Sequence, residues 1–289
     1  MIELLITIST FSSMVMLFKY FEKINVNNLQ AIIVNYFTAG VISIILLPNN
    51  FDFIKVNNYQ SILFLVLAFV VGLLFVLTFN LYAYGSQKIG ITPSTIANKM
   101  SMIIPIIIGL VLLNEELTFN KIIGISFAFG AIFLSSLGDK KYNLIKNHLI
   151  IILLLFTGQG LADGILNWAQ KNILNSSNMN LFFAITFLSA GFLGLLFLFF
   201  KFIRNKAKIQ HKSIIWGIAL GIPNYLTLFY FIKSLKSEQF SSSEIFPIIN
   251  IGVIIFCSIL SIILFKERVS IYNWIGVILG ICSIFIILS

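Results

Sequence analysis

The sequence predicts an all-α integral membrane protein whose ten transmembrane helices form two inverted five-helix repeats. Three observations support this fold class: the composition is too apolar for a water-soluble surface, long apolar runs recur along the chain, and the chain matches itself at a constant offset. Mean hydropathy is +1.02 and only 10% of the 289 residues are charged, against roughly 25% in soluble domains. Lipid is therefore the expected solvent for most of the surface.

Ten continuous apolar runs are long enough to be spanning helices. A helix rises ~1.5 Å per residue, so about 20 residues cross the ~30 Å hydrocarbon layer. The runs do not alternate with polar residues, which argues against spanning β-strands. In chain order we expect helices over residues 2–19, 29–47, 60–84, 92–113, 118–137, 149–170, 179–200, 213–235, 243–265 and 271–288.

The connections between these runs are short, so the sequence offers no separate soluble domain for nucleotide or nucleic acid. The net charge is +9, from 19 basic and 10 acidic residues. The basic residues gather in the short loops, where they act as topology signals rather than as a nucleic-acid surface. The expected partners are the lipid bilayer and a small-molecule substrate, and no nucleic acid.

A shift of 152 residues overlays the chain on itself without a gap. Most matches pair one apolar residue with another, so the polar ones carry the weight: Asn98 falls on Asn250 and Glu115 on Glu267. A constant offset between polar residues indicates a duplicated structural unit.

The two units are expected over residues 1–138 and 149–289, with a connecting loop over 139–148, and each unit holds five spans. Because five is odd, the second unit enters the membrane from the opposite side. Many secondary transporters are built from such inverted repeats and bind their substrates between the two halves. A duplicated scaffold that transports nothing is the alternative.

Each unit also ends in a helix, a short acidic turn and a helix that carries glycine. The two turns lie in "NEELTFNKIIG" and "KERVSIYNWIG". Over essentially its whole length the chain resembles the ten-helix, EamA-like branch of the drug/metabolite transporter superfamily. The resemblance implies a secondary transporter of small organic metabolites. The chain departs from the family pattern at Asn35, where arginine is usual, and in how far Pro105 and Pro247 lie from the turns.

Two topology signals disagree about which side holds the termini. Thirteen Lys and Arg residues lie in the loops after spans 1, 3, 5, 7 and 9, and five lie on the other side. The excess of basic residues on the cytoplasmic side puts both termini outside, whereas the family resemblance implies cytoplasmic termini. Both alternatives place the two termini on the same side of a cytoplasmic (inner) membrane.

Lys99 stands about seven residues inside the fourth run, ~10 Å below the membrane surface at helical rise. Its long stem can carry the ammonium to the headgroups, but charges inside a membrane usually face the bundle interior. In the second case Lys99 meets a substrate carboxylate or phosphate, and Asn98 and Asn250 offer amides at equivalent depth. An amino acid or a similar carboxylate-bearing solute is then the favoured substrate.

The sixth run carries a polar stripe, because Gln159, Asp163 and Asn167 recur every four residues and share one helical face. Such a stripe should face protein or water, which makes Gln159 and Asn167 candidate substrate-binding residues. Asp163 is the candidate for proton coupling. A structural hydrogen bond to a neighbouring helix is an equally good interpretation of Asp163.

Three prolines inside predicted spans are candidate hinges: Pro105, Pro223 and Pro247. Each lacks an N–H and therefore frees a carbonyl one turn earlier in its helix. Asn224, Tyr225 and Tyr230 follow the second of them and are candidate substrate-binding residues. Ordinary packing or a lipid-facing position is the alternative for the two tyrosines.

The sequence contains no recognisable catalytic, cofactor-binding or metal-binding motif. A membrane-embedded enzyme and a non-transporting membrane subunit are the alternatives to a carrier. Glu115 and Glu267 are expected to cap the helix that follows each of them or to pair with loop lysines.

Small residues four apart let helix backbones approach closely in a membrane. Gly276 and Gly280 have this spacing, and their repeat mates are Gly124 and Ala128. The fifth and tenth helices are therefore expected to pack on each other. The chain is expected to be a monomer or a homodimer.

Overall fold

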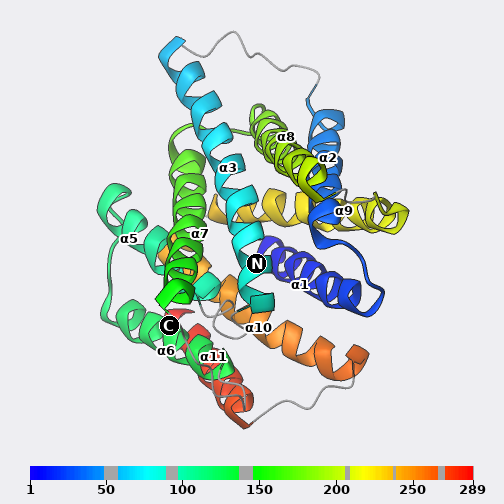
Figure 1. Ribbon diagram of the computed structural model, residues 1–289. Helices are drawn as coiled ribbons and strands as arrows, with labels where there is room; N and C mark the ends of the chain where they lie inside the picture. Colours follow the sequence, from blue (N-terminus) through cyan, green and yellow to red (C-terminus); the bar gives the residue numbers. More distant parts are fainter. Residues whose placement is uncertain are drawn as a thin grey trace.

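Figure 1 shows the computed structural model, which describes residues 1–48, 58–88, 97–136, 146–205, 209–236, 239–265 and 271–288. Within these ranges the chain is helical and contains no strand. The helices are α1 (Ile2–Lys23), α2 (Asn28–Ile45), α3 (Asn58–Lys88), α5 (Ile103–Leu112), α6 (Phe119–Ser136), α7 (Lys146–Asn172), α8 (Met179–Asn205), α9 (His211–Leu235), α10 (Ser242–Phe265) and α11 (Ile271–Leu288).

The helical membrane class predicted from the sequence is confirmed. Seven helices of the described chain are long and apolar enough to cross a membrane, whereas Ala97–Leu112, Phe119–Leu134 and Trp274–Ile287 form shorter apolar helical segments. Ten spans and an inverted orientation of the two halves therefore stay predictions. Most of the expected connecting loop, residues 139–148, lies outside the described residues.

The helices are arranged around a central group. α2 and α8 lie side by side at one end of the bundle, α6 and α11 lie side by side at the other, and α1, α3, α7, α9 and α10 fill the space between (Figure 1). The most extensive contacts join helices from different halves of the sequence. The two halves are thus interleaved.

If two units are related by the shift, each contact between two helices should recur between their counterparts in the other unit. α1 packs on α9 and α10, and their counterparts at the offset of 152, α7 with α3 and α5, also pack together. α2 packs on α9 as α8 packs on α3. The bounds of α6 and α11, Phe119–Ser136 and Ile271–Leu288, coincide after the same shift. This pattern supports a repeated architecture.

α6 and α11 approach closely at Gly124, as the small-residue spacing predicts. The Ser283 hydroxyl donates a hydrogen bond to the Gly124 carbonyl across a distance of 2.7 Å. A Cβ atom at Gly124 would lie 2.4 Å from Cγ1 of Ile287. A Cβ atom at Gly280 would lie 2.6 Å from Cγ2 of Ile251 on α10 and 3.5 Å from Cβ of Ala131 on α6, so Gly280 faces both helices.

Gly124→Ala is expected to destabilise the protein. The added methyl group overlaps Ile287 close to its backbone, and such overpacking costs about 1–3 kcal/mol. Gly130→Ala on the same helix is the matched control, because its Cβ would meet only the end of the Leu279 side chain, at 3.0 Å. Thermal unfolding of both purified variants measures the difference; equal midpoints would contradict the close contact at Gly124.

Candidate functional site

A cavity of about 340 Å³ lies among the central helices of the bundle. Side chains from α1, α3, α7, α9 and α10 line it, together with the helical residues that precede α5. The polar and thiol-bearing lining residues are Thr7, Thr78, Tyr82, Asn98, Lys99, Gln159, Asp163, Asn224, Thr227, Asn250 and Cys257. Both halves of the chain therefore contribute to the lining of the cavity.

Lys99 lies inside the bundle and faces this cavity. Lys99 is only 7% exposed, and its Nζ lies 4.1 Å from the centroid of the Phe11 ring. A cation over an aromatic face is attracted by the electrons of the ring. This position agrees with the interior hypothesis for Lys99 rather than with an ammonium that reaches the headgroups.

Asp163 faces the same cavity from α7. Gln159, one turn earlier, donates from its Nε2 to both carboxylate oxygens of Asp163 at 3.2 Å. The Asp163 carboxylate and the Lys99 ammonium both line the cavity. The cavity therefore contains one charge of each sign and an amide that orients the negative one.

Three asparagine amides complete the polar lining. Asn98 and its repeat mate Asn250 both line the cavity, so the same position in each half contributes an amide. Asn224 also lines it and donates from its Nδ2 to Oδ1 of Asn35 on α2 at 3.0 Å. Asn35 thus holds a cavity amide in place.

Apolar side chains form most of the remaining wall. The rings among them belong to Phe11, Phe18, Phe75, Phe79, Phe231 and Phe246. Nothing in the local pattern of the sequence singles out these six among the 30 phenylalanines of the chain. The shift of 152 residues does single out Phe11, because Phe11 falls on Asp163, which the sequence predicted for the site.

Three of the residues predicted for the site do not line the cavity. Tyr225 is buried and its hydroxyl donates to Oδ1 of Asn180 at 2.9 Å. Tyr230 packs edge-on against Phe229, with ring centroids 5.3 Å apart. Asn167 lies one turn beyond Asp163 and contacts α10. The packing interpretation left open for the tyrosines describes both.

The candidate hinges differ from one another. The chain turns at Ser101 and Met102, so Pro105 falls in the first turn of α5, where a missing N–H costs little. The Ser101 carbonyl accepts instead from Ile104 N at 3.0 Å. Pro223 and Pro247 lie inside α9 and α10, which continue through them.

Comparison with known proteins decides the family. The model of the EamA-like transporter family matches residues 1–137 and 149–289. The chain belongs to this family. EamA-like proteins form part of the drug/metabolite transporter superfamily, so the resemblance inferred from the acidic turns is confirmed.

Individual relatives agree with this assignment. The chain is 29% identical over 274 residues to an uncharacterized protein of Haemophilus influenzae, covering 93% of this chain and 91% of the relative. A crystal structure of a protein with 11% sequence identity superposes with a TM-score of 0.76 over 99% of this chain and 94% of the other. The second likeness shows a shared fold.

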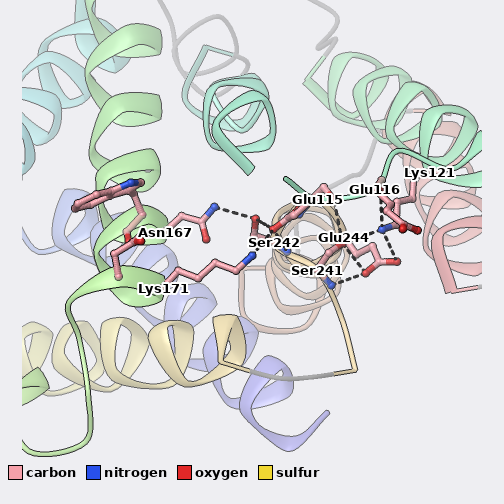
Figure 2. A network of polar contacts seen from close by, with 11 residues as sticks. Glu115, Glu116, Lys121, Asn167, Lys171, Ser241, Ser242 and Glu244 are labelled. Carbon is pink, nitrogen blue, oxygen red and sulfur yellow. Dashed lines mark hydrogen bonds and ion pairs between the residues drawn. The ribbon is translucent and has the colours of Figure 1, made fainter. Parts of the chain in front are cut away.

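The acidic turn between α5 and α6 contains Glu115, which is part of a polar network at the start of α10 (Figure 2). We use this name for Glu115, Lys121, Asn167, Lys171, Ser241, Ser242 and Glu244. Glu115 Oε1 accepts from the Ser242 amide at 3.0 Å and from the Ser242 hydroxyl, and Oε2 accepts from the Ser243 amide at 3.0 Å. Glu115 thus caps α10, whereas the sequence suggested the helix that follows it.

Helix α7 joins the network through two residues. Nδ2 of Asn167 donates to the Ser242 hydroxyl at 2.8 Å, and Nζ of Lys171 lies 3.9 Å from Oε1 of Glu115. The lysine ends α7 rather than lying in a loop. Glu267, the repeat mate of Glu115, lies outside the described residues.

Glu244 and Lys121 form the other part of the network. Oε2 of Glu244 accepts from the amide and the hydroxyl of Ser241, at 2.6 and 2.8 Å, and the first of these bonds is one half of a capping box. Nζ of Lys121 donates to the Ser241 hydroxyl at 3.1 Å and lies 3.6 Å from Oε1 of Glu244. The first turn of α10 is therefore bonded to α6 as well.

Glu115 is expected to make stability depend on pH. Burial opposes ionisation, but hydrogen bonds from Ser242 and Ser243 outweigh it, so the pKa of Glu115 lies below its ordinary value of 4.5. A lowered pKa stabilises the folded state above pH 4.5, and this contribution is lost as the pH falls through the folded pKa. The melting temperature should therefore fall more steeply in the native protein than in Glu115→Gln as the pH drops below 4.5. Parallel curves would contradict this role for Glu115.

Proposed function

We propose that this protein is a secondary transporter that moves small organic metabolites across the cytoplasmic membrane by alternating access. The substrate class is an amino acid or a similar carboxylate-bearing solute. The observation that carries the proposal is the pair of opposite charges, Lys99 and Asp163, in a cavity that both halves of an EamA-like chain enclose. The two termini are proposed to lie on the same side.

The size of the cavity favours one small molecule. Pockets for small ligands have volumes of about 300–1,000 Å³, and this cavity is near the lower end at about 340 Å³. Its walls are mainly apolar, so each polar group inside it is poorly screened by water. A single carboxylate that reaches Lys99 can therefore be selected by charge.

The polar groups are suited to a solute that is charged at one end. Lys99 offers the ammonium that a carboxylate needs, and Asn98 and Asn250 offer amides that can donate to its oxygens. The phenylalanine rings suit the apolar part of the same solute. Asp163 adds a carboxylate that can receive a proton or a substrate ammonium.

Lys99→Ala is expected to reduce transport at least tenfold, because a hydrogen bond to a charged group contributes about 1.5–3 kcal/mol. Uptake is measured in proteoliposomes with a panel of labelled amino acids and simple carboxylates. Lys212→Ala is the control, since Lys212 is exposed at the start of α9. Native uptake by Lys99→Ala, with equal insertion of both variants, would remove Lys99 from the site.

We also propose that Asp163 couples transport to protons. A carboxylate in a cavity that opens alternately to two sides can bind a proton on one side and release it on the other. Asp163→Asn should abolish accumulation driven by a pH gradient while exchange of labelled for unlabelled substrate continues. An unchanged response to the pH gradient would leave Asp163 with a structural role.

A further inference from the structure

The polar network lies between the cavity and the outside of the bundle. On α10, Asn250 and Phe246 line the cavity, and Ser242 follows one turn nearer the start of the helix. On α7, Asp163 lines the cavity, Asn167 comes one turn later, and Lys171 another turn later. The two helices therefore lead from the same cavity to the same network.

Exposure increases through the network in that direction. Asn167 and Ser242 are buried, and the Glu115 side chain is 6% exposed. The Lys171 side chain is 48% exposed. Glu115, Ser242 and Asn167 are bonded to one another, and Lys171 lies beside them (Figure 2).

The network joins the two halves of the chain. Glu115 belongs to the turn between α5 and α6 in the first half, and its partners Ser242 and Lys171 belong to the second. Gly109 in the last turn of α5 leaves room for this contact, because a Cβ there would lie 2.7 Å from Oγ of Ser242 and 2.9 Å from Oε2 of Glu115. The turn that follows α5 is thus joined to the start of α10 by polar bonds, while α5 and α10 also pack on each other.

We propose that the polar network is a gate that closes the cavity at the start of α10. Hydrogen bonds between polar partners can be exchanged for bonds to water when the two halves separate, so such a contact opens at low net cost. A purely apolar seal would expose its side chains to water instead. The role as a gate rests on alternating access, but closure itself can be tested without any substrate.

Cys257 is a natural reporter for closure. It lines the cavity from α10, about three turns beyond Phe246. The only other cysteine of the sequence, Cys282, is exposed and can be replaced by serine. The rate at which a membrane-impermeant maleimide labels Cys257 in vesicles of both orientations measures access from each side. A separate variant, Glu116→Cys without the native cysteines, identifies the side that holds the network.

Slow labelling of Cys257 from the network side is expected in the otherwise native protein. Glu115→Gln and Ser242→Ala should each raise this rate about tenfold, because each removes a charge-assisted hydrogen bond across the gate. Glu116→Gln is the matched control. Glu116 is exposed, and its described contact uses the backbone carbonyl, which accepts from Lys121 Nζ at 3.1 Å.

Two results would overturn the gate. One is rapid labelling of Cys257 from the network side in the otherwise native protein. The other is a labelling rate in both Glu115→Gln and Ser242→Ala that equals the rate in Glu116→Gln. Ser242→Ala keeps the test decisive if Glu115→Gln does not fold, because it removes one hydroxyl group and leaves the cap of α10 by Glu115 in place. Labelling needs no transported solute, so these results are separate from failure of the proposed transport.

Discussion

The burial of one ammonium group in a bundle of apolar helices is the constraint on which the rest of this structure depends. A charged side chain in hydrocarbon is costly, and it is tolerated where protein groups or water receive it. The Lys99 ammonium lies over the ring of Phe11. It lines the same cavity as the Asp163 carboxylate and the asparagine amides. Phe11 and Asp163 come from α1 and α7, so the charge requires both halves of the chain around it.

Helices α7 and α10 link the cavity to the polar network. α7 carries Asp163 and Asn167 one turn apart, and α10 carries Asn250 and Ser242 two turns apart. Pro247 lies between Ser242 and Asn250 and lacks the N–H of one backbone hydrogen bond. The first turn of α10, which Glu115 caps, is therefore joined to the cavity-lining part of the helix through a candidate hinge.

Much of the fold and part of the site could be predicted from the sequence. Apolar runs locate helices because lipid leaves the backbone few other ways to satisfy its hydrogen bonds. The interior position of Lys99 and the facing of Gln159 and Asp163 follow from the cost of charge and from helical periodicity. At Ala97–Leu112 and Trp274–Ile287 the apolar run in the sequence is longer than the apolar helical segment in the described part of the structure, so run length alone does not predict the length of such a segment.

The remaining features depend on neighbours far away in the sequence. Glu115 caps α10 because folding brings Ser242 next to it, and local patterns favour the adjacent helix instead. Tyr225 follows Pro223 closely, yet its hydroxyl is directed to Asn180 on another helix. Periodicity gives the face of a helix, and only the packing of the helices decides whether that face meets a cavity or a neighbour.

The cavity is nearly symmetric in its framework and unsymmetric in its charges. The shift that pairs Asn98 with Asn250 pairs Asp163 with Phe11 and Lys99 with Ile251. Two identical copies related by this shift would carry each ionic group in duplicate, with like charges repelling across a shared axis. A single cation with a single anion therefore requires two halves that differ in sequence at these positions.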